Sequence, residues 1–319
     1  MQQYIARRLL MFVPLLLGAA LFIFIIMRIL PGDVALVILS AGGEGAAATE
    51  EKLATLRHQL GLDRPYWEQF GLWLWDVVRL DFGKSLWSGE PISKELAIRL
   101  PLSLQLIIMI TAVSLIISIP IGVISAIRQD AITDYFLRVF AIFGLALPSF
   151  WIGILLIMLL LLVFHWIPPL GYANFFEDPS KNMQILIWPA IAAGYRQAAV
   201  ITRMTRSCML EVIREDYIRT AWAKGLSERV VVIRHALKNS LLPVITIVGI
   251  EFAYLFGALV VTETVFTLPG MARYLVDAIY HRDYPVVQTI ILILVTFVAT
   301  ANLLVDLTYG WLDPRIRYQ

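Results

Sequence analysis

Charged residues, cysteine and histidine are scarce in this chain. Only 16% of its 319 residues are charged, and the net charge of +2 is too small to favour a nucleic-acid partner. The single cysteine, Cys208, excludes an internal disulfide, and the four histidines lack the spacing of a zinc site, so no metal ligand is predicted. No constellation for chemistry is complete, which predicts that the chain is not a catalyst on its own.

The chain is rich in apolar residues. Hydrophobic residues make up 59% of it and the mean hydropathy is +0.77, more than a water-soluble fold of this length could bury. A bilayer core of about 30 Å needs roughly 20 apolar residues in a helix, so runs of that length predict membrane spans. The predicted spans are Leu9–Leu30, Leu102–Ile127, Val139–Trp166, Ile185–Thr202, Ser240–Val261 and Val286–Val305.

Lysine and arginine are divided unevenly between the connections. The amino end, the loop 128–138, the segment 203–238 and the tail after Asp313 together hold fourteen, whereas the two short connections on the opposite side hold three. Positive residues concentrate on the cytoplasmic side of membrane proteins, so both termini are predicted to face the cytoplasm.

The stretch 31–100 follows the first predicted span and is expected to lie outside the cell, since loops of roughly 70 residues escape the charge rule. We expect one helix capped by Thr49 and ending at Gly61, and a second helix that starts at Pro65. The second helix is expected to lie on the membrane surface or on the spans. Its predicted apolar face is Tyr66, Phe70, Trp73 and Val77.

The segment 203–238, between the fourth and fifth predicted spans, is too long for a turn and carries both charge signs. Acidic residues open its central part and Lys224 lies near the end, which suits a helix dipole; Gly225 predicts a left-handed stop, and Ser227 is an expected cap of the next helix. A short helix over about 216–225 would transmit a push from a docked partner into the membrane. The alternative is a solvated basic loop beside anionic lipid headgroups.

The same segment resembles the E-A-A-x-x-x-G…L-P loop of ABC importer permeases, with Ala221, Gly225 and the downstream Leu242–Pro243 at the matching positions. Arg219 and Thr220 stand where Glu and Ala would be, a variant common in the dipeptide and oligopeptide branch. Other stretches similar to that branch are Leu30–Asp33, Leu60–Pro65, Leu147–Trp151, Glu263–Phe266, Pro269–Gly270, Arg282–Pro285 and Asp313–Arg317.

The resemblance implies an all-α membrane protein with six transmembrane helices and the type I ABC importer permease fold. We divide it into 1–100, the first span with the external helical segment, and 101–319, a five-helix core. The implied partners are a second homologous permease, two ATPase subunits that bind ATP and Mg²⁺, an external solute-binding protein and membrane lipid, with no cofactor on this chain. The implied function is import of peptides across a bacterial or archaeal cytoplasmic (inner) membrane.

Three groups of site residues are carried over from the resemblance. The predicted ATPase-coupling helix comprises Asp216, Tyr217, Arg219, Thr220, Ala221, Lys224 and Gly225, and its predicted supports are His235, Asn239 and Pro243. The predicted outer gate or binding-protein contact comprises Glu263, Phe266, Pro269, Gly270, Arg282 and Asp283. The segment 267–284 also has an apolar stripe, for which a plain interfacial helix is the alternative.

Two charges lie inside predicted spans. Arg196 and Glu251 are each about 16 Å deep at 1.5 Å per residue, near the bilayer midplane. A charge there is expected to face the bundle interior or water. We predict that they line a translocation cavity and contact the termini of a zwitterionic peptide. The alternative is a mutual salt bridge, or a contact with the second permease, that only supports packing.

The sequence also leaves other functions open. Similar permeases move nickel chelates, glutathione or oligosaccharides. An ATP-independent secondary transporter or channel would be expected to show paired, broken spans with inverted repeats, and no internal repeat is evident. A membrane enzyme or scaffold is disfavoured because no chemical constellation is complete.

Overall fold

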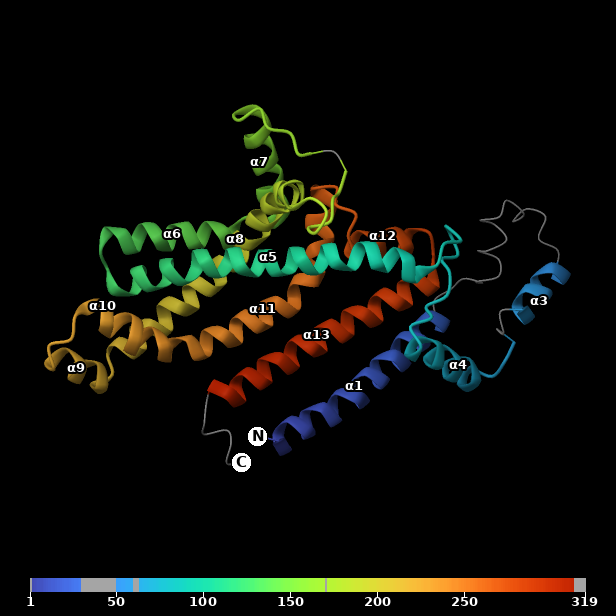
Figure 1. Ribbon diagram of the computed structural model, residues 1–319, viewed down its shortest axis with the longest axis horizontal. Coiled ribbons are helices and arrows are strands. Elements are labelled where there is room, and N and C mark those ends of the chain that lie inside the picture. Colours follow the sequence, from blue (N-terminus) through green and yellow to red (C-terminus); the bar gives the residue numbers. More distant parts are fainter. Residues whose placement is uncertain (1, 30–49, 60–62, 170, 313–319) are drawn as a thin grey trace. The chain divides into compact units, whose positions relative to one another are not determined.

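The computed structural model describes residues 2–29, 50–59, 63–169 and 171–312, and in these ranges the fold is helical, with one isolated β-bridge between Lys84 and Pro91 (Figure 1). The all-α prediction is therefore confirmed. The helices are α1 (Gln2–Ile29), α3 (Glu50–Gln59), α4 (Tyr66–Val78), α5 (Ile92–Ile127), α6 (Ile132–Ala146), α7 (Ser149–Leu162), α8 (Pro179–Ile213), α9 (Asp216–Ala223), α10 (Glu228–Val230), the π-helix η2 (Val231–Leu237), α11 (Lys238–Val265), α12 (Met271–Tyr280) and α13 (Tyr284–Leu312).

Within the described ranges, five helical stretches are long and apolar enough to cross a membrane. They are Leu10–Ile29, Ile92–Ile127, Pro179–Ile213, Glu228–Val265 and Tyr284–Val305. A sixth crossing exists only if α6 and α7 count as one span, because these helices meet at an angle of 106°. The predicted span Val139–Trp166 falls on this bent pair of helices. Pro148 disfavours helical backbone geometry at the preceding residue, and Leu147 is extended, with φ −91° and ψ 133°.

The chain forms two compact units. Unit 1 comprises Met1–Pro101 and Gly270–Thr300, and unit 2 comprises Leu102–Pro269 and Ala301–Gln319. Helices α5 and α13 each contribute to both units.

In unit 1, α4 packs on α1 through aromatic rings. The ring centroid of Phe24 lies 5.4 Å from that of Phe70 and 6.1 Å from that of Trp73. Phe70, Trp73 and Val77 of the predicted apolar face pack on spanning helices, whereas Tyr66 is exposed. Thr49 and Gly61, the predicted ends of α3, lie outside the described residues. The buried centre of this cluster is Ala20, Ile23 and Leu292.

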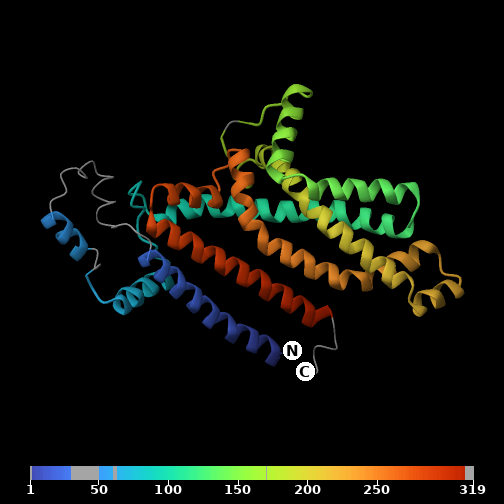
Figure 2. The same cartoon turned by 180° about the vertical axis from the view of Figure 1, so that it is seen from behind.

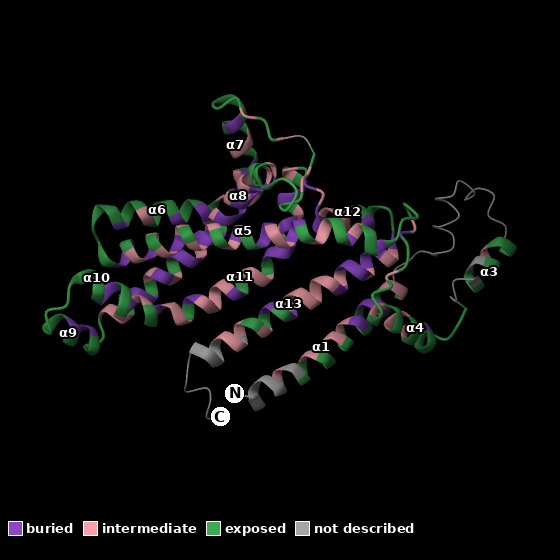
Figure 3. Ribbon diagram, viewed as in Figure 1, coloured by how far each residue is buried: buried purple, intermediate pink, exposed green. Residues whose placement is uncertain are grey.

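In unit 2, α8 is the most buried of the spanning helices and packs against α6, α7 and α11 (Figure 3). Glycines allow the closest approaches. A Cβ placed on Gly122 of α5 would lie 2.6 Å from the Thr205 Cβ, and one on Gly144 of α6 would lie 2.9 Å from the Ala199 Cβ. Without a hydrophobic driving force between helices in lipid, such small-residue contacts set which helices associate.

The tight contact at Gly122 is testable. We expect Gly122→Ala to destabilise the protein by about 1–3 kcal/mol, because the added methyl overpacks the contact with Thr205. The matched control is Gly257→Ala in α11, where nothing lies within 4 Å and alanine, the better helix former, is expected to be neutral or to stabilise by up to about 1 kcal/mol. Thermal unfolding of both variants in detergent makes the comparison, and equal melting temperatures would contradict the packing.

Candidate functional site

Helix α9 lies at the end of unit 2, beyond the ends of α8 and α10 (Figure 1), and the reverse view shows the same arrangement (Figure 2). The predicted helix over 216–225 is present as Asp216–Ala223. It begins after Glu215, whose backbone is extended, and it is followed by Gly225 with a φ of +76°, the predicted left-handed stop. Ser227 precedes α10 as predicted, but its side chain makes no capping hydrogen bond.

The inner face of α9 is apolar and buried. Ile218 is fully buried and Ala221 is 6% exposed. Both pack into a pocket of buried residues that we call the α9 seat, formed by the ends of α5 and α8 together with η2. The buried residues of the seat are Ala126, Met209, Val231, Val232 and Ala236. An eight-residue helix is marginal in isolation, so α9 depends on this seat for its stability.

The outer face of α9 is open (Figure 3) and carries polar side chains. The side chains of Asp216 and Arg219 are 97% and 75% exposed, and they form a loose ion pair of 3.5 Å. Thr220 and Lys224 are also exposed. Such an exposed pair contributes little to stability, so these side chains are available to a partner.

The predicted support residues differ in their contact with α9. Asn239 Nδ2 donates a 2.8 Å hydrogen bond to Tyr217 Oη, which ties α9 to the start of α11. His235 lies in η2 and Pro243 within α11. Neither forms a side-chain hydrogen bond with the described residues of α9.

Arg196 and Glu251 lie in α8 and α11, where the sequence predicts midplane charges. Arg196 is exposed and Glu251 is partly buried. Neither makes a hydrogen bond or ion pair of 4 Å or less with another described residue, so the mutual salt bridge, one of the predicted alternatives, is not formed. Next to Arg196, Gln197 is 2% exposed and both polar atoms of its amide lack a partner within the described chain.

The predicted gate residues of unit 2 are partly structural. Glu263 is fully buried and its Oε1 accepts a 2.6 Å hydrogen bond from Ser103 Oγ, which joins α11 to α5. Pro269 lies in the connection that follows α11. Phe266, which directly follows α11, lines an apolar cavity.

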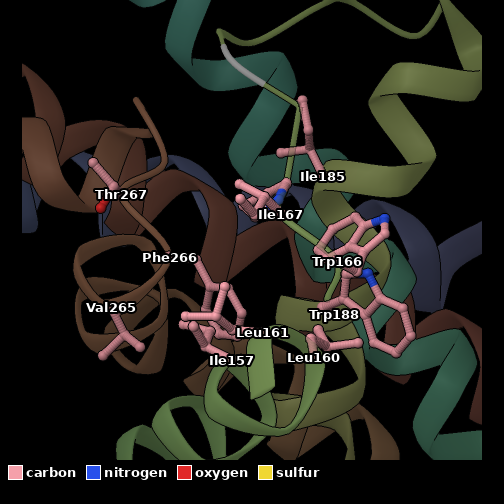
Figure 4. A pocket seen from close by; sticks show the side chains of 11 residues that line it. Ile157, Leu160, Leu161, Trp166, Ile167, Ile185, Trp188, Val265, Phe266 and Thr267 are labelled. Atoms are coloured by element: carbon pink, nitrogen blue, oxygen red, sulfur yellow. The ribbon is translucent and has the colours of Figure 1, made fainter. Parts of the chain in front are cut away.

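That cavity has a volume of about 380 Å³ and lies between α7, α8 and the end of α11 (Figure 4). Trp166 and Trp188 meet edge to face in its wall, with ring centroids 5.7 Å apart. None of its lining residues is charged, so it does not suit the charged termini of a peptide. The remaining lining residues are Ile157, Leu160, Leu161, Ile167, Pro168, Ile185, Val265, Phe266 and Thr267.

The predicted gate residues of unit 1 lie around α12. Gly270 precedes the helix, and Arg282 follows it with a φ of +54°. Asp283 is 2% exposed and anchors the turn before α5, accepting hydrogen bonds from Ser85 Oγ at 2.5 Å and from the Leu86 backbone N–H at 3.1 Å. Its carboxylate thus holds two parts of unit 1 together.

Tyr274 lies on the buried side of α12, with the Arg99 guanidinium 4.4 Å from its ring centroid. Burial, and secondarily the carboxylates of Asp283 and Glu95, raise the pKa of Tyr274 to about 12. The hydroxyl therefore stays protonated at physiological pH, and the contact with Arg99 is a cation–π contact.

Comparison with known proteins agrees with these observations. Residues 118–318 match the family described as binding-protein-dependent transport system inner membrane component, and residues 1–107 match the N-terminal part of such membrane components. The chain belongs to this family. The resemblance drawn from the coupling-loop residues is thereby confirmed, and the protein is a multi-pass membrane permease with a type I permease fold.

The permease is similar to named relatives over its whole length. It is 38% identical to the dipeptide transport system permease protein DppB of Alkalihalophilus pseudofirmus and 39% identical to the protein of that name from Escherichia coli K12, with all of each chain covered. It is 40% identical to a probable peptide ABC transporter permease protein, y4tP, of Sinorhizobium fredii, with 99% of each chain covered.

Sequence reasoning missed several residues around the permease's α9. Ile218, the fully buried anchor of the helix, was signalled only by its spacing of three from Ala221. The π-helix η2 had no sequence signal, although π segments frequently occur at functional sites. The contact between Asp134 and Arg206, in which the two groups are 2.7 Å apart, joins residues too distant in sequence for any periodicity to reveal.

The left-handed stop of α9 is testable. We expect Gly225→Val to destabilise the end of α9 by about 1–2 kcal/mol, because a β-branched residue does not tolerate the φ of +76°. Gly225→Asn is the control, since asparagine accepts this conformation more readily. Hydrogen exchange of the α9 amides measures the effect; equal exchange in both variants would show that the backbone conformation is not the constraint.

Proposed function

We propose that this permease is one of two membrane subunits of an ATP-driven importer of dipeptides or short peptides. The observation that carries the proposal is α9, a short helix that presents an open polar face above a buried apolar seat. The full-length similarity to proteins named as dipeptide and peptide permeases supports the solute class.

The proposed complex has four further kinds of component besides lipid: a second homologous permease, two ATPase subunits, the ATP and Mg²⁺ that they bind, and an external solute-binding protein. The permease itself contributes no catalytic group. Both termini and α9 face the cytoplasm of a bacterial or archaeal cell, in line with the fourteen positive residues on that side against three in the two short connections on the other. The family description, which names a binding-protein-dependent system, supports the external receptor.

In the proposed cycle, ATP binding closes the two ATPases, and each holds the α9 of one permease. The exposed Asp216, Arg219 and Lys224 are the docking side chains, while Ile218 and Ala221 pass the displacement into the seat. Because the seat contains the ends of α5 and α8, the spans move as rigid bodies and open to the outside. The binding protein then releases its peptide between the two permeases, and hydrolysis restores the inward-facing state.

The first test determines which subunits accompany the permease and whether solute uptake requires ATP. The tagged permease is isolated from its own host in mild detergent for native mass spectrometry, and the complex is reconstituted for uptake of a labelled dipeptide. We expect a second permease, two ATPase copies and uptake that requires ATP and the binding protein. A chain that purifies alone and takes up solute without ATP would contradict the proposal. A nickel chelate, glutathione or an oligosaccharide as the co-purified mass would correct only the solute.

Arg196 and Glu251 are proposed to contact the peptide's carboxylate and amino group. We expect Glu251→Gln to raise the apparent KM for a zwitterionic dipeptide roughly tenfold, the loss of about 1.4 kcal/mol of charge-assisted contact. An N-acetylated dipeptide, which lacks the amino charge, is the control and should show little change. Lower protein yield with an unaltered KM would instead assign Glu251 to packing.

A further inference from the structure

Asp134, in the first turn of α6, is a buried carboxylate with several donors around it. It is fully buried, and it accepts hydrogen bonds from Ser125 Oγ of α5 and from the Asp130 backbone N–H at 3.1 Å. Arg206 of α8 approaches it with two nitrogens, Nε at 3.0 Å and Nη2 at 2.7 Å, and Nε also lies 3.1 Å from Ser125 Oγ. We call these residues the Asp134 junction.

The junction joins three helices at a fixed angle. Arg206 is bidentate, and the planar guanidinium fork restricts orientation as well as distance. A buried ion pair gives little net stability over apolar packing, because desolvating two charges offsets their attraction. What this geometry supplies is a defined relative position of α5, α6 and α8.

The junction lies directly beside the α9 seat. Ser125 precedes Ala126, and Arg206 is one turn before Met209 on α8; Ala126 and Met209 are both buried seat residues that share a cluster with Ile218 of α9. A displacement of α9 is therefore passed to α8 at Met209. This residue lies one helical turn from Arg206, where α8 is fixed to α6.

Farther along, α6 stays in contact with α8. The Tyr195 hydroxyl donates a 2.6 Å hydrogen bond to the Phe140 carbonyl, and Gly144 lies against Ala199. These contacts hold the two helices together along their length, whereas the junction fixes them at the end nearest α9. None of the contacts involves an outer-face residue of α9.

We propose that the Asp134 junction is a positioning element for transport, which locks α5, α6 and α8 into one body beneath α9. An ATP-driven displacement of α9 then moves the three helices together instead of being absorbed between them. This inference rests on the proposed function. Asp134 and Arg206 touch neither solute nor nucleotide in this scheme; they act through α9 and its seat.

The test uses the whole reconstituted importer with Arg206→Lys, which keeps the charge but removes the bidentate fork. We expect the ATP hydrolysed per peptide transported to rise about tenfold, with the ATPase rate and the KM for peptide nearly unchanged. The control is Arg203→Lys, one turn earlier on α8, where the side chain is exposed; it should keep the wild-type ratio. If Arg206→Lys leaves the ratio of ATP hydrolysed to peptide transported unchanged, the proposal is overturned. This holds also where transport and ATPase activity fall in proportion.

A distance measurement that needs no uptake complements the ratio. Spin labels at Ala223 of α9 and Ile142 of α6, both exposed, are introduced in a Cys208→Ser background. The distance between them should change by less than about 2 Å between the nucleotide-free and ATP-trapped states of the wild-type complex, and by more in Arg206→Lys. A distance that changes in the wild type overturns the proposal. A wild-type complex without ATP-dependent uptake would instead show that the proposed function itself has failed.

Discussion

The fold depends on one constraint: inside a bilayer, every backbone N–H and C=O group must find its hydrogen-bond partner within the protein. Long helices meet this constraint locally, which is why helical stretches such as Ile92–Ile127 and Pro179–Ile213 account for most of the described chain. Departures from the regular helix then become informative. The bend at Leu147–Pro148 interrupts the regular ladder beside the helices that pack on α8, and the π-helix Val231–Leu237 interrupts it beside α9, the proposed coupling helix.

Polar side chains act together with the small residues in selecting which helices of unit 2 associate, because lipid is as apolar as leucine and provides no hydrophobic drive between helices. Three polar contacts all involve α5. Ser103 bonds Glu263 of α11, Gln105 bonds Asn182 of α8, and Ser125 bonds Asp134 of α6. These contacts specify the neighbours of α5, and the glycines at the helix contacts then allow the backbones to approach closely.

The sequence predicted what depends on local residues. Apolar runs located the spans, and the charge pattern with Gly225 located α9 and its stop, because dipole, capping and left-handed φ are properties of a few consecutive residues. Contacts between distant residues were not predictable. Arg206 and Asp134 are 72 positions apart, and their pairing depends on the rotation of two helices about their axes. The apolar run through Pro148 predicted one span there, and the angle of 106° between α6 and α7 had no signal in the run itself.

The two faces of α9 explain why so short a helix suits coupling. Eight residues do not form a stable helix in water, so α9 persists only while Ile218 and Ala221 stay in the seat. A partner that pulls on the outer face of α9 therefore has two outcomes: the seat follows, or the helix melts. The Tyr217–Asn239 hydrogen bond opposes melting because it ties α9 to the start of α11, and the Asp134 junction fixes α8, which carries part of the seat, to α6. In the proposed cycle, coupling thus requires that α9 be held in its seat more strongly than the seat resists displacement.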